Sequence, residues 1–140
     1  MPDRDIILAK VAIIQRCLKR IQETTNLDPH NLDDINKQDI FVLNLQRAIQ
    51  AAIDLAVHII ASEGLGLCET IKDNFKILKN TGIINDHLMQ KMEAMSGFRN
   101  IAIHDYQAID IKILKSILSS NLKDLEDFYT ALLIHFNIVK

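Results

Sequence analysis

The feature that most constrains this chain is how rarely anything interrupts a helical pattern. Its 140 residues include only four glycines and two prolines, the residues that most often break regular structure. Between them, apolar residues recur every three or four positions, which places them on one face of an α-helix. The clearest stripe is Ile7, Val11, Ile14, Leu18 and Ile21. The pattern predicts an all-α protein with long helices.

Five helices follow from these stripes. We expect them over residues 5–24, from 36 to the glycine at 64, over 70–82, from 85 onward, and from 110 to the end of the chain. Asn36 followed by Asp39 resembles a capping box at the start of the second helix, and polar residues 26–38 predict the longest loop. No stretch alternates in the way that strands do. The expected architecture is a helical bundle forming a single domain, residues 1–140.

Composition excludes several classes of protein. Sixteen basic residues against eighteen acidic ones give a net charge of −2, which argues against a protein that coats nucleic acid nonspecifically but leaves room for a local basic cleft. The N-terminus does not resemble a signal peptide, and no stretch has the roughly 20 apolar residues of a membrane span. Cys17 and Cys68 form no C-x-x-C pair. We therefore expect reduced thiols in a cytoplasmic protein that does not enter a membrane.

Residues 97–106 depart from a plain bundle. Gly97 lies inside a helical pattern, where glycine costs about 1 kcal/mol relative to alanine, so we expect it to permit the close approach of another backbone or side chain. Arg99 follows Met92 by seven residues and projects from the same apolar stripe. A charge on that face needs a partner, a cleft or a ligand. His104 and Tyr106 come at or just after the expected helix end.

Arg99 and His104 are suited to cleaving RNA without a metal. Arginine grips phosphate and can stabilise the charge growing on a phosphorane, while histidine can take and give a proton near neutral pH. On one helix the two residues are rotated by about 140° and separated by about 7.5 Å along the axis. A second copy in a symmetric dimer would complete the site. The residues alone leave open a simpler alternative, in which the pair caps a helix and forms a salt bridge.

Other chemistries find no support in the sequence. None of the histidines has metal-ligand spacing with a neighbour, so no metal site is expected. The sequence also lacks a phosphate-binding loop, a glycine-rich dinucleotide turn and a serine or cysteine nucleophile motif.

The stretch "GFRNIAIHDY" contains the pattern R-x-x-x-x-H-x-Y as Arg99, His104 and Tyr106. Together with "NLQRAIQAAIDLAVHIIASEGLG" and "LMQKMEAMSGFRNIAIHDYQAID", it resembles the HepT-like toxins of the HEPN superfamily over most of the chain. The resemblance implies a dimeric five-helix bundle and a metal-independent ribonuclease that is toxic to its own cell and needs no cofactor. It makes Arg99 and His104 the catalytic residues, with Gly97 and Asn100 supporting them, and transfer RNA one candidate substrate.

The resemblance also implies a partner. HepT-like toxins pair with an antitoxin of minimal nucleotidyltransferase (MNT) fold, which transfers AMP from ATP to the motif tyrosine, here Tyr106. We expect the AMP to compete for Arg99, because a continued helix would place positions 99 and 106 within about 20° of each other. Two alternatives remain at this point. One is a catalytically inactive HEPN domain that binds a nucleotide or a partner, and the other is a purely structural helical dimer.

Overall fold

The longest helix, α2 (Ile35–Glu63), forms the centre of the molecule in the computed structural model, which describes residues 2–138. Its buried residues cover a wide face of the helix and include four alanines, at 48, 51, 52 and 56, that let neighbouring helices approach closely. A wide apolar face is typical of a helix that packs against several others. By length and composition α2 could also cross a membrane, which the sequence expectation did not allow for, but most of its apolar stretch is buried by other helices.

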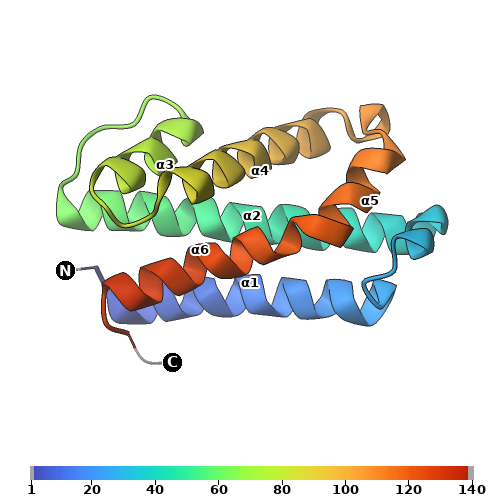
Figure 1. Cartoon of the computed structure of the whole chain (residues 1–140), viewed down its shortest axis with the longest axis horizontal. Helices are drawn as coiled ribbons and strands as arrows, with labels where there is room; N and C mark the ends of the chain where they lie inside the picture. The colour runs from blue at the N-terminus through green and yellow to red at the C-terminus, as the bar shows by residue number, and fades with distance from the viewer. Residues whose placement is uncertain (1, 139–140) are drawn as a thin grey trace.

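The other elements surround α2. In chain order they are α1 (Arg4–Thr25), the 3₁₀ helix η1 (Pro29–Asp33), α3 (Ile71–Asn80), α4 (Asp86–His104), the 3₁₀ helix η2 (Tyr106–Ala108), α5 (Ile111–Ser120) and α6 (Leu122–His135). The most extensive packing is between the antiparallel α1 and α2, and α3, α4 and α6 cover other sides of α2 (Figure 1). The start of α1 and the end of α6 lie at one end of the bundle, while η1, η2 and α5 gather at the other.

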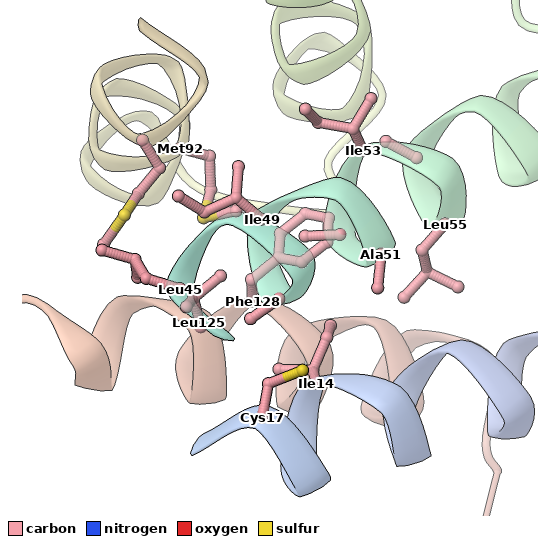
Figure 2. Packing of buried hydrophobic residues seen from close by; sticks show 14 of the residues in the cluster. Ile14, Cys17, Leu45, Ile49, Ala51, Ile53, Leu55, Met92, Leu125 and Phe128 are labelled. Atoms are coloured by element: carbon pink, nitrogen blue, oxygen red, sulfur yellow. The ribbon is translucent and has the colours of Figure 1, made fainter. Parts of the chain in front are cut away.

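The helices form one shared core. Figure 2 shows side chains from α1, α2, α4 and α6 meeting there, among them Ile14, Ile49, Met92 and Phe128, all fully buried. Phe128 also meets the ring of Phe75 on α3 edge to face, with ring centroids 5.6 Å apart, a favoured aromatic geometry. The predicted all-α bundle and its apolar stripes are confirmed.

Side-chain caps set the helix starts, and one of them corrects a prediction. Asp34, not Asn36, caps α2, because its carboxylate accepts from the backbone N–H groups of Asn36 and Lys37 at 2.9 and 3.2 Å. The proposed capping box of Asn36 and Asp39 is therefore wrong, and Asp39 is free for another role. At the end of α2, Gly64 adopts a left-handed φ of 61°, as expected of glycine after a helix.

One further element differs from the sequence prediction. The last predicted helix is broken at Asn121, whose N–H bonds the Ile117 carbonyl to close α5 and whose side chain bonds Asp124 in the first turn of α6. The described chain thus has six α-helices rather than five. The break lets α5 pack on η1, where Lys115 donates to Asp33 at 2.8 Å and holds the pKa of that carboxyl below its usual value.

Candidate active site

The end of α4 decides how the motif residues are displayed. The helix closes when the N–H of Asp105 bonds the Ile101 carbonyl at 2.8 Å, and the backbone of Asp105 then leaves the helical region with φ −154° and ψ 64°. Arg99 and His104 therefore lie on α4, whereas Tyr106 begins η2. The expectation that a continued helix aligns Tyr106 with Arg99 is wrong, because the helix ends between them.

Arg99 is half-buried and incompletely paired. One terminal nitrogen, Nη1, donates to the side-chain oxygen of Asn100 at 2.7 Å. The Nε nitrogen is buried and has no hydrogen-bond partner among the described residues, and no carboxylate of residues 2–138 forms an ion pair with the guanidinium. An unpaired buried donor of this kind costs about 1–3 kcal/mol. The guanidinium is thus held by the protein while part of its donor capacity stays unused.

His104 has the opposite environment. It is the last residue of α4 and is exposed, and within residues 2–138 no side chain or backbone group is hydrogen bonded to its imidazole. Both ring nitrogens can therefore reach a bound molecule. Both residues lie on α4 five positions apart, so the two side chains are about 140° apart around the helix, and no hydrogen bond joins them in the described chain.

Gly97 does not serve a close contact inside this chain. A Cβ added there would meet nothing within 4 Å, apart from the helix's own backbone and its immediate neighbours. The expectation of a close approach is therefore wrong for the single copy, and no contact among the described residues requires a glycine at this position.

Tyr106 contacts the N-terminal part of α2. Its hydroxyl lies 2.5 Å from a carboxylate oxygen of Asp39 and 3.3 Å from the side-chain oxygen of Gln38. A phenol has a single proton, so it donates to one of these, and the shorter bond identifies Asp39 as the acceptor. Partial burial, then the hydrogen bond and the negative charge of Asp39, raise the pKa of the Tyr106 phenol above its ordinary value.

A basic groove lies between α1 and α2. It has a volume of about 880 Å³, and the residues that line it include the apolar Ile13 and Leu43. Five basic side chains line it, against two acidic ones; the basic residues are Lys10, Arg16, Lys19, Arg20 and Arg47. One of them, Lys10, pairs with Asp54 at 3.3 Å. The local basic cleft that the net charge left open is therefore present.

One residue that lines the groove is adjacent in sequence to the Tyr106 contact. Ile40 lines the groove and directly follows Asp39, the residue that accepts from Tyr106. The two side chains are about 100° apart around α2, so the groove and the contact lie on neighbouring sides of this helix.

Comparison with known proteins identifies the family to which this chain belongs. The model of the family described as "Ribonuclease HepT-like" matches residues 14–132, which include the whole stretch from Gly97 to Tyr106. This chain belongs to the ribonuclease HepT-like family. The family resemblance inferred from the motif is confirmed.

Two relatives and one solved structure support the assignment. The chain is 39% identical over 124 residues to the mRNA nuclease HepT of Shewanella oneidensis, covering 89% of this chain and 93% of that protein. It is 32% identical over 107 residues to the tRNA nuclease HepT of Aphanizomenon flos-aquae, covering 75% and 72%. The structure of the tri-AMPylated Shewanella oneidensis HEPN toxin in complex with MNT antitoxin superposes with a TM-score of 0.87 at 37% identity, covering 93% and 98%.

Asp39 and Gln38 are the residues near the HepT-like motif that sequence reasoning missed. Asp39 lies 67 positions before Tyr106, and Gln38 lies 68 positions before it. A local pattern therefore offered only a capping explanation for Asp39. Their contact with Tyr106 becomes visible only in the folded chain, where the Tyr106 hydroxyl reaches both side chains.

The remaining histidines serve local roles or lie at the surface. His58 accepts from the backbone N–H of Asp3 at 3.1 Å, and the ring of His135 packs edge to face on Phe136. Among residues 2–138, no group of three or more His, Cys, Asp or Glu side chains is arranged to hold a metal ion.

Proposed function

We propose that this chain is the toxin of a HEPN/MNT toxin–antitoxin pair in the cytoplasm, an endoribonuclease that uses Arg99 and His104. The observation that carries the proposal is the half-buried Arg99, whose Nε has no partner, five residues before an exposed, uncommitted His104. In a purely structural domain an unpaired buried donor only lowers stability. In a phosphate-binding site the same arginine is a cation that the protein holds in position with a donor left for the ligand.

The chemistry uses the RNA's own 2′-hydroxyl as nucleophile. His104 takes the 2′-hydroxyl proton, or gives a proton to the leaving 5′-oxygen. Arg99 donates to the phosphorane oxygens as their charge grows. A single imidazole cannot be both base and acid in the same step, so two histidines, one from each copy of a dimer, fit the reaction better than one.

Exposed apolar residues at this end of α4 support such a dimer. The side chains of Ile101 and Ile103 are 51% and 44% exposed, and Ile101 lies about 60° from His104 around the helix. Apolar surface beside a polar site is typical of an interface. We propose that a second copy packs here and brings its own Arg99 and His104 to the same cleft, with Gly97 facing the partner.

The basic groove supports RNA as the substrate class. A chain of net charge −2 places five cations in one groove, and such a groove attracts a phosphate backbone at short range. RNA is also the substrate named for the Shewanella and Aphanizomenon relatives. We propose that the substrate backbone follows this groove toward the end of α4.

Variants at two helix ends test the nuclease. His104 and His135 are each the exposed last residue of a helix, so His135→Ala is a matched control for His104→Ala. We expect Arg99→Ala and His104→Ala to lower cleavage of total cellular RNA by about 10²–10⁴-fold, with folding intact by circular dichroism, and His135→Ala to cleave like the wild type. Full activity in either site variant contradicts the catalytic assignment.

Two further measurements test the mechanism. We expect cleavage to persist after dialysis against a chelator, and its loss would contradict a metal-independent reaction. Light scattering should show a dimer at micromolar concentration. A monomer that keeps its activity would refute the shared site.

We also propose that an MNT antitoxin silences this chain by transferring AMP to Tyr106, as implied by the tri-AMPylated Shewanella relative. Tyr106 lies two residues after His104. An added nucleotide would therefore obstruct the proposed Arg99 and His104 cleft and place an anion where the RNA phosphate must lie. Tyr129 is the chain's other tyrosine and provides the control. After incubation with the antitoxin and ATP, mass spectrometry should find AMP on wild type and Tyr129→Phe but not on Tyr106→Phe. AMP on Tyr106→Phe would contradict the assignment.

A further inference from the structure

The hydrogen bond between Tyr106 and Asp39 joins the proposed modification site to a carboxylate on another element. Tyr106 begins η2, and Asp39 lies in the second turn of α2. The two oxygens lie within hydrogen-bond distance of each other, so the phenol donates to the carboxylate. The bond is made by the folded chain before any partner arrives.

A tyrosine that attacks ATP has to lose its proton. Neutral phenols are weak nucleophiles and need an adjacent base. The pKa of Tyr106 is raised by partial burial and by Asp39, so the group is fully protonated at neutral pH. Spontaneous ionisation therefore cannot supply the nucleophile, and some group must accept the proton as the new bond forms.

We propose that Asp39 is the general base for AMP transfer onto Tyr106, so that the toxin itself supplies the proton acceptor for its own inactivation. The inference rests on the proposed function, in which Tyr106 is the acceptor of AMP. Phosphoryl transfer to the hydroxyl of a protein substrate commonly uses an aspartate in this position, although there the enzyme provides it.

The step balances. The Tyr106 oxygen forms a bond to the α-phosphorus of ATP, the bond from that phosphorus to the bridging oxygen of the β-phosphate breaks, and pyrophosphate leaves. The phenol proton moves to the Asp39 carboxylate. Asp39 is exposed, so the proton then passes to water and the carboxylate is restored for a further cycle.

Neighbouring groups do not offer the same chemistry. Gln38 approaches the hydroxyl at 3.3 Å, but an amide oxygen does not hold a proton at neutral pH. His104 and Asp105 precede Tyr106 in the chain, yet neither is hydrogen bonded to the phenol among the described residues. Asp39 is therefore the one described side chain that both touches the reacting atom and can take its proton.

The variant Asp39→Asn distinguishes two roles for Asp39, that of a proton acceptor and that of a contact that only positions Tyr106. Asparagine keeps an oxygen that can accept from Tyr106, but it cannot take the proton. Gln38→Ala is the matched control, since it removes the other oxygen beside the phenol. Each purified toxin variant would be incubated with the MNT antitoxin and ATP, and AMP on the peptide containing Tyr106 would be followed by mass spectrometry from pH 6 to 9.

We expect Asp39→Asn to slow AMP transfer by about 10²–10⁴-fold at neutral pH, and its remaining rate to rise about tenfold per pH unit as hydroxide replaces the lost base. Gln38→Ala should stay within a few fold of the wild type. A rate for Asp39→Asn equal to the wild type, or lower by the same factor at every pH, would overturn the inference, because either result assigns Asp39 no proton transfer. Thermal melting of each variant checks that it is folded.

The two levels of proposal fail differently. If the wild type acquires AMP at another residue or none at all, the modification in the proposed function is wrong. If the wild type is modified at Tyr106, and the rate for Asp39→Asn equals the wild-type rate or is lower by the same factor at every pH, only the role of Asp39 is wrong.

Discussion

Replacing Gly97 by alanine tests directly what the glycine in α4 is for. Its backbone is helical, and an added Cβ would meet nothing within 4 Å. The substitution therefore adds no clash within the chain, and it removes the entropic cost of glycine in a helix interior, about 0.5–1 kcal/mol. For a domain of this size we expect the melting temperature to rise by about 2–4 °C.

Gly64 provides the matched control. It also has open space where a Cβ would lie, but its φ is +61°, a conformation that costs an L-residue about 1–2 kcal/mol. Gly64→Ala should therefore destabilise the fold, and the two alanine variants should differ by about 1.5–3 kcal/mol in the free energy of unfolding.

Urea unfolding of the wild type and both variants, followed by circular dichroism at one protein concentration, measures the difference. A loss of stability in Gly97→Ala, measured at a concentration where wild type and variant are both monomeric, would refute the view that nothing in the single chain needs this glycine. Light scattering on the same proteins at higher concentration tests the proposed interface. If the partner copy packs on Gly97, the added methyl should weaken the dimer and lower RNase activity while the fold is stabilised. An unchanged dimer would place the interface elsewhere.

Three further outcomes follow from the site and its caps. Arg20→Ala should weaken binding of a non-cleavable 2′-O-methyl RNA and reduce the salt dependence of log K by about one unit, whereas Lys72→Ala on α3, outside the groove, should leave both unchanged; equal effects would argue against the groove. The raised pKa of Tyr106 means that its contribution to stability is present below the pKa of the unfolded chain and is lost as pH rises through the folded value. In Asp39→Asn, ultraviolet titration should therefore show the phenol ionising at lower pH than in the wild type, and an unchanged titration would contradict the assigned cause. The hydrogen bonds at the Thr70 backbone and side chain lower the pKa of Asp73 in the capping box of α3, so its contribution is present above the unfolded value and is lost as pH falls through the folded one. Asp73→Asn should lower the melting temperature at pH 7 but not in strong acid, and a difference that persists at low pH would contradict this.

The sequence by itself determined the helices and the chemistry of the motif. Helical periodicity and capping act between residues three or four positions apart, so the stripe from Ile7 to Ile21, the helix end at Gly64 and the exposed end of α4 could all be predicted locally. Arg99, His104 and Tyr106 could also be selected, because a charge on an apolar stripe is conspicuous in sequence and the motif is specific to its family.

Only the tertiary structure decided what those residues touch. The contact between Tyr106 and Asp39 joins positions 67 apart, and no local pattern encodes a pairing that arises only when the folded chain brings the Tyr106 side chain to α2. The same applies to the break at Asn121, which local periodicity does not mark and which lets α5 cover η1. The unpaired Nε of Arg99 and the groove between α1 and α2 are likewise products of packing, since burial depends on which helices meet and at what angle.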